Sequence, residues 1–359
     1  NFCRLIVKNK LNYLFAILTS SGFMMLVNGQ IPPNLDDNWK LNTTKSDEFN
    51  STTLDNSKWD MLDPWNGVGY NWGGGQYFRP ANVSVDGNNL QLKVEDIPWS
   101  DKYYSGGVHS VDHNYSYGYF EIRAKLPGFY NNGSPCGEGF WPAFWTYYVE
   151  HDVNGCRKVH DEIDILEPSG SQYADAKTNV CGWHDEHPDC NIDHIKIGEG
   201  TFTNSTPLFD NFHKYAVEWL PDRIIFYFDD QPFYFEYNHP KIVMKPQFVV
   251  IDQQIDGGLS VPYLNPNTPL PQYMSVDYFR YHELNYSYCG QNATILNNTQ
   301  LNSFTYGVRQ NIIIGNGSSS IFLLGGDNKT FRAINEITIN GDFTVPLGSE
   351  LNLVPTPCK

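Results

Sequence analysis

Short apolar runs, separated by glycine, asparagine, aspartate and proline, recur along most of the chain. No strong helical period accompanies them, and the runs are rich in β-branched and aromatic residues. Many short strands with frequent turn residues are typical of an antiparallel β-sandwich. We therefore expect an all-β protein, with strands at residues 89–94, 117–125, 215–219, 223–228 and 248–251.

Residues 119–125 show the clearest alternation, Tyr-Phe-Glu-Ile-Arg-Ala-Lys. Successive side chains of a strand point to opposite faces, so this pattern indicates a sheet with one buried and one wet face.

The composition changes near the end of the chain. All nine tryptophans lie before residue 220, and beyond residue 284 asparagine, threonine, isoleucine and glycine replace the aromatic residues. Such a shift predicts a domain boundary. We expect a main domain at residues 40–283 and a small β module of short repeating turns at residues 284–359.

The start of the chain resembles an export signal. Three basic residues precede an apolar run at residues 14–27, which ends in small residues. This pattern predicts a signal peptide at residues 1–29 and a linker at residues 30–39. A transmembrane anchor is the alternative, but polar residues at 19–22 interrupt the run, and it is short for a span. We expect a secreted, extracellular protein with no stable membrane span after signal removal.

The chain is acidic, with 24 lysines and arginines against 40 aspartates and glutamates, a formal net charge of −16. Because there is no basic stripe to displace counterions, nucleic acid is not an expected partner. An uncharged ligand suits such a protein best. We expect it to be a monomer.

Of the seven cysteines, Cys3 lies in the predicted signal, which leaves an even number. In an exported chain this indicates disulfides. Pairing of sequence neighbours is the simplest connectivity: Cys136 with Cys156, Cys181 with Cys190, and Cys289 with Cys358. Four residues spaced three apart also offer zinc a tetrahedral site as an alternative to a disulfide-closed loop: Cys181, His184, His187 and Cys190.

Residues 162–167, Glu-Ile-Asp-Ile-Leu-Glu, place three acids in an apolar strand pattern, and burying acid is costly unless a site uses it. Glu162 and Asp164 are two apart and share a face, whereas Glu167 joins them only if one residue between is bulged. Two glutamates with an aspartate between them can form the carboxylate pair of a retaining glycosidase. That mechanism holds its two carboxyls about 5 to 5.5 Å apart.

Two other interpretations of these acids exist, a solvated strand edge and a calcium site. The large apolar residues Ile163, Ile165 and Leu166 argue against the edge, because they indicate a core on the opposite face. Calcium-binding loops are usually flexible and glycine-bearing, unlike this stretch.

The segments around these acids resemble glycoside hydrolase family 16 over roughly residues 40–283. The matching segments are residues 47–50, 54–59, 117–125, 140–145, 212–224 and 274–281. The resemblance implies a concanavalin-like β-jelly roll, two curved sheets with a sugar cleft across the concave face. It also implies endo-hydrolysis of β-linked glucans or galactans with retention. The extra residue in the motif resembles the bulged branch of laminarinases, agarases, porphyranases and carrageenases.

Carried over by position, the resemblance makes Glu162 the nucleophile and Glu167 the acid/base. Asp164 then holds the charge and proton balance of the nucleophile. The roles fit the chemistry, because Glu167 must carry a proton for the leaving oxygen while Glu162 must be ionised to attack.

Sugar rings present apolar C–H faces, which bind flat aromatic side chains. Trp141 and Trp145 share a face just before the catalytic strand, although Trp145 as sandwich core is the alternative. Loop tryptophans are further platform candidates: Trp65, Trp72 and Trp183.

Three more residues are candidates for binding. Arg79 is expected to bond a sugar hydroxyl or a sulfate, with a surface ion pair as the alternative. His184 is expected near the leaving group, with a solvated loop histidine as the alternative. Asp277 matches a structural calcium site of several relatives. We expect no cofactor for catalysis.

The sequence therefore predicts a secreted endo-acting retaining β-glycosidase acting on a polysaccharide, β-1,3-glucan or a marine galactan. Residues 246–254 depart from the apolar sequence usual in glucanases, which leaves the polymer open. A lectin-like sandwich without turnover and a transglycosylase are the alternatives. A pure binder has no need of a proton donor at Glu167.

Overall fold

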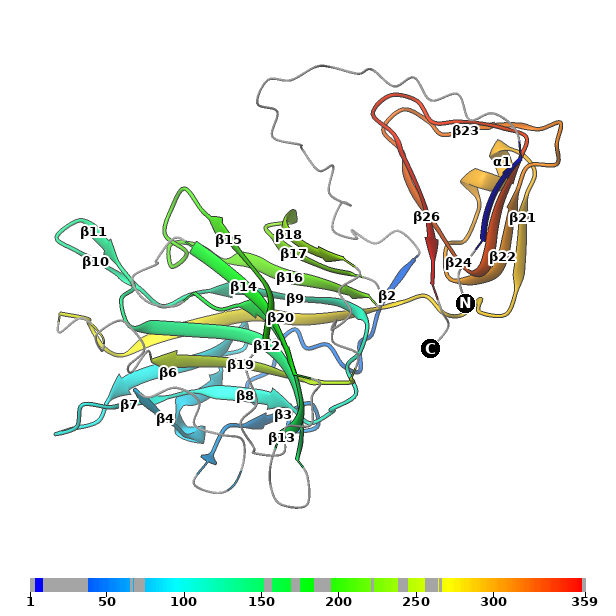
Figure 1. Ribbon diagram of the computed structural model, residues 1–359. Helices are drawn as coiled ribbons and strands as arrows, with labels where there is room; N and C mark the ends of the chain where they lie inside the picture. The colour runs from blue at the N-terminus through cyan, green and yellow to red at the C-terminus, as the bar shows by residue number, and fades with distance from the viewer. Residues whose placement is uncertain are drawn as a thin grey trace. The chain divides into compact units, whose positions relative to one another are not determined.

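The computed structural model describes residues 4–8, 38–64, 67, 75–151, 157–168, 175–183, 195–220, 223–237, 245–255, 264 and 267–356. Within these ranges only the backbone is described at residues 4–8, 151, 157–160, 176–183, 195–197 and 328. The chain divides into two compact units, traced in Figure 1. One is Leu41–His282, and the other combines Asn1–Lys40 with Glu283–Lys359.

The first unit is a sandwich of two largely antiparallel sheets, as the sequence predicts (Figure 1). The larger sheet has ten strands in the spatial order β18-β17-β16-β9-β20-β6-β7-β4, with β2 beside β20 and β5 beside β6. In chain order its strands are β2 (Trp39–Leu41), β4 (Gln76–Phe78), β5 (Val83–Val85), β6 (Leu90–Asp96), β7 (Tyr103–Ser105), β9 (Gly118–Lys125), β16 (His213–Leu220), β17 (Arg223–Phe228), β18 (Gln231–Tyr237) and β20 (Gln272–Leu284).

The smaller sheet has seven strands in the order β15-β14-β13-β12-β19-β8-β3. They are β3 (Trp59–Met61), β8 (Gly107–Ser110), β12 (Phe140–His151), β13 (Arg157–Leu166), β14 (Asp175–Trp183), β15 (Ile195–Thr203) and β19 (Phe248–Ile255). A hairpin of β10 (Phe129–Asn131) and β11 (Ser134–Cys136) and a 3-10 turn, η2 (Pro80–Asn82), belong to neither sheet.

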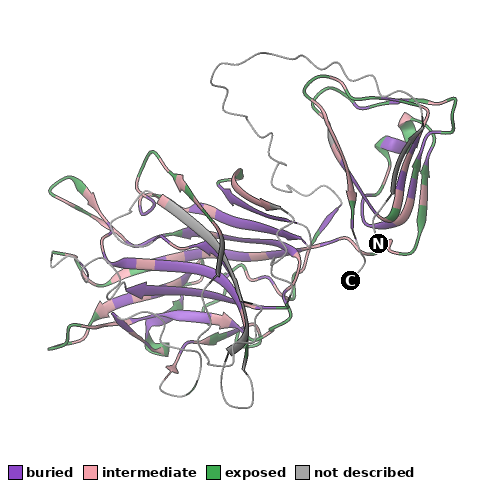
Figure 2. Ribbon diagram, viewed as in Figure 1, coloured by how far each residue is buried: buried purple, intermediate pink, exposed green. Residues whose placement is uncertain are grey.

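Side chains from both sheets meet in one core. Phe120 and Ile122 of β9 reach it from the larger sheet, and Phe144 and Ile251 reach it from the smaller one. All four are fully buried, and Figure 2 shows buried strands running through both layers. Burial of this apolar surface is the main force that holds the sheets together.

The outer face of β9 differs from the prediction of a wet face. Tyr119 and Glu121 are only 3% and 7% exposed. Glu121 accepts hydrogen bonds from the hydroxyls of Tyr119 (3.0 Å) and Tyr278 (2.7 Å), which makes its burial tolerable. Alternation separates the two faces of a strand, but it does not reveal what covers the outer one.

The chain crosses from the larger to the smaller sheet at Gly106, between β7 and β8. A Cβ at this position would collide with the backbone carbonyl of Asn82, so the crossing needs glycine. The first and last residues of the unit lie side by side, because the N–H of Asn42 donates to the carbonyl of Tyr281 over 2.9 Å.

The second unit is a short parallel β-solenoid. Its strands are β1 (Arg4–Lys8), β21 (Asn292–Ile295), β22 (Arg309–Ile314), β23 (Ser320–Phe322), β24 (Asn328–Asn340), β25 (Asp342–Thr344) and β26 (Glu350–Pro355). All their pairings are parallel, in a sheet of β1-β24-β22-β21 with β26 beside β24, and in a pair β23-β25. One short helix, α1 (Asn298–Asn302), begins at Asn297, whose side chain accepts from the N–H of Gln300.

Neighbouring turns of the solenoid place identical side chains above one another. Ile295, Ile314 and Ile339 lie in register on three strands and belong to a core separate from that of the sandwich. Strand β1 lies within residues 1–29, where the sequence predicts a signal peptide, and that assignment stays a prediction.

The predicted disulfide between Cys136 and Cys156 is wrong, because Cys136 is a free cysteine. It ends β11, where its Sγ lies 3.6 Å from the carbonyl of Ser134 within its own hairpin. Cys289 is disulfide-bonded. The other cysteines and histidines of the predicted pairs and of the zinc alternative lie outside the described residues or have only their backbone described: Cys156, Cys181, His184, His187, Cys190 and Cys358.

Across the ranges given above, no helix has the length and apolar character needed to cross a membrane.

Candidate active site

Strand β13 carries the three predicted acids. Glu162 pairs with Tyr147 of β12, and Asp164 pairs with Trp145. Residues that pair across two strands share a face, so these four side chains lie together.

A bulge follows at once, as the sequence predicts. Leu166 pairs with Phe144, the residue next to Trp145, so Ile165 is an extra residue on β13. Ile165 and Leu166 both reach the sandwich core. Because two consecutive residues point inward, Glu167 returns to the face of Glu162 and Asp164.

We call this face of the seven-stranded sheet the site face. It is opposite to the core, and it carries an apolar cluster of its own that includes Trp145, Tyr147 and Val250. Asp164 is 4% exposed, whereas Glu162 and Glu167 are partly exposed. Two accessible glutamates thus flank a buried aspartate.

A fourth acid of the site face, Asp252, was not recognised from the sequence. It lies on β19, where it pairs with Ala143 of β12 and with Gly107 of β8. It is fully buried, and the Nε2 of Gln254 lies 3.3 Å from each of its carboxyl oxygens.

Burial raises the pKa of Asp252 to about 8, and the negative charge of Glu167 adds to this rise. The Gln254 and Trp145 side chains offer N–H donors and act in the opposite sense, but burial outweighs them. Burial therefore favours the neutral form of Asp252. The interaction with Glu167 also places these two carboxyl groups near each other.

Aromatic rings form a row along the site face. Trp145 contacts Tyr147 edge to face, with centroids 5.5 Å apart, and Tyr147 contacts Phe248 in the same way at 5.5 Å. His113 and His109 continue the row beyond Phe248, at 5.0 and 5.8 Å. Such edge-to-face contacts hold the rings in fixed orientations.

The two tryptophans of β12 have different surroundings. Trp141 is partly exposed on the site face beside Gln254. Trp145 is only 5% exposed, yet it belongs to the cluster of the site face rather than to the sandwich core. Trp141 therefore has the more accessible ring, whereas Trp145 contacts Tyr147 and Asp252.

Three other predicted binding residues lie beyond what the structure describes. Trp65, Trp72 and His184 are outside the described residues. Trp183 ends β14, where its backbone pairs with His160, and its side chain is not described.

Arg79 is engaged in an ion pair, the alternative that the sequence left open. Its guanidinium donates to Glu95, its Nε lies 2.6 Å from the Oδ1 of Asn82, and it stacks over the ring of Tyr104 at 3.5 Å. Two of its nitrogens, Nε and Nη2, already have protein acceptors, so Arg79 is not part of the candidate site.

Asp277 is engaged in an ion pair, and its assignment as a calcium ligand stays a prediction. The Oδ2 of Asp277 lies 2.6 Å from the Nη1 of Arg123, which supplies the positive charge at this position. The described side chains contain no group of three or more acidic, histidine or cysteine residues that would hold a metal.

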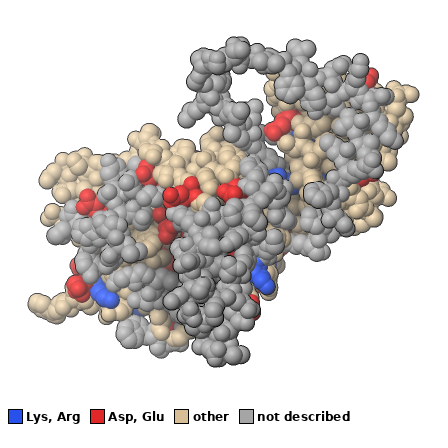
Figure 3. All heavy atoms as spheres, in the orientation of Figure 1, with Lys and Arg blue, Asp and Glu red and all other residues tan. Residues whose placement is uncertain are grey.

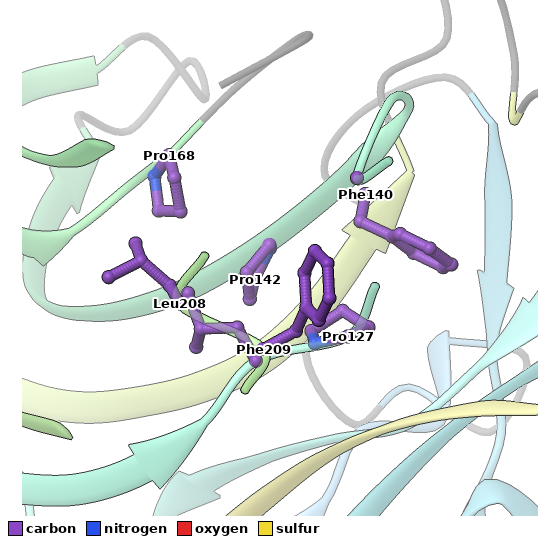
Figure 4. A pocket seen from close by; sticks show the side chains of 8 residues that line it. Pro127, Phe140, Pro142, Pro168, Leu208 and Phe209 are labelled. Carbon is purple, nitrogen blue, oxygen red and sulfur yellow. The ribbon is translucent and has the colours of Figure 1, made fainter. Parts of the chain in front are cut away.

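A small apolar pocket opens near the end of β13 (Figure 4). Its volume is about 20 Å³, room for about one water molecule, so it is too small for a sugar ring. Its lining is Leu126, Pro127, Gly137, Phe140, Pro142, Pro168, Leu208 and Phe209. Without a polar side chain it cannot take part in acid chemistry.

The missed residues carried weak signals in the sequence. Tyr147 continues the spacing of two that joins it to Trp145, so it was within reach of the same periodicity argument. Asp252 is a single acid at the end of the apolar run 248–251, the same kind of signal that singled out residues 162–167. His109 and Phe248 became neighbours only through the pairing of β8 with β19.

Comparisons with known proteins agree with this geometry. The family model described as Beta-porphyranase A-D, GH16 domain, matches residues 39–254. Glucan endo-1,3-beta-glucosidase A1 of Niallia circulans is 28% identical over 268 residues, which cover 67% of this chain and 37% of that protein. Beta-glucanase of Rhodothermus marinus is 30% identical over 53% of this chain and 63% of its own length. Beta-porphyranase E of Zobellia galactanivorans is 29% identical over 56% of this chain and 70% of its own. The chain thus spans between about a third and two thirds of the first two relatives.

Solved structures share the fold. The laminarinase catalytic domain of Thermotoga maritima superposes with a TM-score of 0.52 at 21% identity, over 68% of this chain and 98% of that one. Porphyranase B of Zobellia galactanivorans gives 0.54 at 20% identity, over 68% and 93%. At these identities the likeness concerns the fold, and it confirms the expected β-jelly roll.

Proposed function

Because the chain belongs to glycoside hydrolase family 16 and is therefore a glycoside hydrolase, we propose that it is an endo-acting, retaining β-glycosidase of polysaccharides. The observation that carries the proposal is the bulge at Ile165, which brings Glu162, Asp164 and Glu167 to one face of β13. A retaining mechanism needs two carboxyl groups on the same side of the sugar.

In the first step, Glu162 attacks the anomeric carbon while Glu167 donates its proton to the leaving oxygen, and a covalent glycosyl-enzyme forms. In the second step, Glu167 removes a proton from water, and the resulting hydroxide displaces Glu162. Asp164, 4% exposed on the same face, holds the charge and proton balance of Glu162 in this mechanism.

The site face suits an extended chain of pyranose rings. The partly exposed ring of Trp141 offers a stacking platform for C–H faces of sugars, beside the row that runs from Trp145 to His109. We propose β-1,3-glucan or a marine galactan as the polymer. The chain matches both a protein named as a glucan endo-1,3-beta-glucosidase and a protein named as a beta-porphyranase.

The net charge of −16 favours a polymer of low charge, and Figure 3 shows acidic groups spread over the face in view with little blue among them. We also propose that the protein is secreted, on the basis of the basic and apolar residues at its start.

Removal of either catalytic glutamate tests the proposal. We expect Glu162→Ala and Glu167→Ala each to lower kcat by about a thousandfold or more, since each removes an essential covalent or proton-transfer step. Thermal unfolding should stay close to wild type, because both side chains are partly exposed. Glu150→Ala, an exposed acid on β12, is the matched control and should keep full activity. Near-full activity in either glutamate variant would refute the assignment.

The polymer is identified by incubating the purified protein with laminarin, mixed-linkage glucan, agarose, porphyran and carrageenan, and separating the products by chromatography. NMR of the first product should show a β-anomer, the mark of retention. An α-anomer would rule out the double displacement. Products longer than the substrate would instead indicate transglycosylation, which uses the same intermediate.

A further inference from the structure

Asp252 is the buried acid of the site face that the proposed mechanism leaves unused. It is fully buried at the middle of the sheet. Its partners on the two neighbouring strands are small, Ala143 on β12 and Gly107 on β8. A Cβ added at Gly107 would lie 2.8 Å from the Cβ of Asp252, so the glycine keeps space open for the aspartate.

Glu167 approaches the same alanine from the other side. Leu166 pairs with Phe144, which sets Glu167 beside Ala143 on β12. Glu167 and Asp252 therefore flank Ala143, two strand spacings or about 9 to 10 Å apart at the backbone. The two side chains, leaning over one methyl group, can close that distance with a hydrogen bond.

The hydrogen bonds of Asp252 leave the O–H of its protonated carboxyl group without an assigned acceptor. The amide of Gln254 lies 3.3 Å from both carboxyl oxygens, and the indole N–H of Trp145 is a second donor to them. A protonated carboxyl also has one O–H to donate. An ionised carboxylate is the strongest acceptor for it, and Glu167 is the charged group that acts on Asp252.

We propose that Asp252 keeps its proton at neutral pH and donates it in a hydrogen bond to Glu167 whenever Glu167 is ionised, so that the two acids form a pair across Ala143. The inference rests on the proposed role of Glu167 as acid/base. Asp252 does not touch the reacting atoms and is a positioning residue. It directs the ionised Glu167 toward the water of the second step and keeps the pair at a single negative charge.

Other titratable groups of the site face support a protonated Asp252. Besides Glu167, the described ones share this face by register: Glu162 and Asp164 on β13, Asp175 on β14, Glu199 on β15, Tyr147 on β12, His109 on β8 and Asp60 on β3. The acids add negative charge, which favours the neutral form of Asp252. Burial lowers the pKa of His109, so this histidine supplies no positive charge at neutral pH to oppose them.

Titration of the carboxyl group tests the pair without any substrate. Carbon-detected NMR of the full chain, labelled at aspartate carboxyl carbons, follows the ionisation of each aspartate, and Asp252 is the signal absent from Asp252→Asn. We expect a midpoint near pH 8 in the wild type, the pKa of about 8 given above. In Glu167→Gln the midpoint should fall by about one pH unit, because the neighbouring charge is gone. An unchanged midpoint would overturn the proposal.

Asp161→Asn is the matched control for this titration. Asp161 is a fully buried acid on the same strand as Glu162, but it pairs with Tyr148 and so lies on the opposite face. The midpoint of Asp252 should not move in this variant. If it moves as far as in Glu167→Gln, the effect is general and the pair does not exist.

Activity gives a second readout. Asp252→Asn keeps an N–H donor and should stay within about threefold of wild-type kcat/KM below pH 8, whereas Asp252→Ala should lose about tenfold. The alkaline limb of kcat/KM should also move upward in Asp252→Ala, because ionised Glu167 has lost its donor. A purely structural role would leave this limb in place.

A wild-type pH profile in Asp252→Ala would refute the pair, as would a folded but inactive Asp252→Asn. If Asp252→Ala does not fold, the activity of Asp252→Asn and the titration of Asp252 still test the pair. Full activity in Glu167→Gln would instead refute the proposed function, and the titration would be unaffected by that result.

Discussion

Single buried carboxyl groups are accommodated in different ways in the sandwich. Glu218, 1% exposed, receives two N–H donors from Arg223 at 2.8 and 3.1 Å. Glu121 receives hydroxyl donors, among them that of Tyr278 at 2.7 Å. Asp252 meets an amide, and its pKa rises to about 8. The three groups thus have different donors, and at Asp252 burial outweighs the effect of its neutral donors on the pKa.

His282 gives a prediction for stability at acid pH. It is 5% exposed, and burial together with the charge of Arg280 lowers its pKa to about 4. Between about pH 6.5 and 4 the unfolded chain binds a proton here and the folded chain does not, so the free energy of unfolding falls as the pH falls. The loss should reach about 2 to 3 kcal/mol near pH 4.

Urea unfolding at neutral and acid pH measures this effect. We expect His282→Gln to lose less stability on acidification than the wild type, by most of that amount. His113→Gln, a substitution at an exposed histidine, is the matched control. Equal acid lability of His282→Gln and wild type would mean that other groups dominate.

At the scale of residues, the sequence predicted the acids that occur in a spaced motif and missed those that act alone. Glu162, Asp164 and Glu167 were found because their spacing on one strand implies a shared face. Asp252 has no such partner along the chain. Its significance comes from Ala143 and Glu167, which reach it only through the pairing of three strands.

Strand elements show which features follow from local rules. The bulge at Ile165 was predictable because the parity of a strand is fixed by counting residues. The crossing at Gly106 was not, because its need for glycine arises from a backbone that approaches from Asn82, distant in the sequence. Local periodicity describes one strand at a time, and close approaches between strands lie outside it.

Gly106→Ala tests the crossing. A methyl group there meets the carbonyl of Asn82 and lies 3.3 Å from the Cα of Leu92, and neither backbone can move away like a side chain. We expect the free energy of unfolding to fall by about 3 kcal/mol. Activity should fall as well, since the carbonyl of Gly106 accepts from the N–H of Gln253, next to Asp252.

Chemical unfolding measures the change, with Gly325→Ala as the control. A methyl group added at Gly325 would have no heavy atom within 4 Å, and this glycine has no left-handed φ. Its substitution should therefore change stability by less than about 0.5 kcal/mol. Equal stability of the two variants would show that the crossing tolerates a side chain.

On the scale of the whole molecule, each of the two units has its own hydrophobic core. We therefore expect residues 39–284, which keep β2 and β20 whole, to fold alone. Their kcat on a soluble oligosaccharide should stay within about threefold of the full chain, since the candidate site lies entirely in this unit. Circular dichroism melting and an initial-rate assay check both points. Loss of cooperative melting in this fragment would show that the second unit is needed for folding.

The composition of residues 284–359 predicted a module of short repeating turns, and the structure has parallel turns there. Its strand direction was not predictable, because parallel and antiparallel pairing use the same residues over such short runs. The wrong pairing of Cys136 with Cys156 has a related cause, since connectivity depends on distances in space that sequence order does not contain.

The hydrogen bond from Asn42 to Tyr281 places the two chain ends of the first unit, Leu41–His282, next to each other. A protein fragment with this property can be transplanted into a surface loop of an unrelated host without stretching either chain. The same adjacency permits circular permutants, in which a short linker joins the old ends and new ends open elsewhere. The proposed glycosidase activity is expected to move with the unit into such a host.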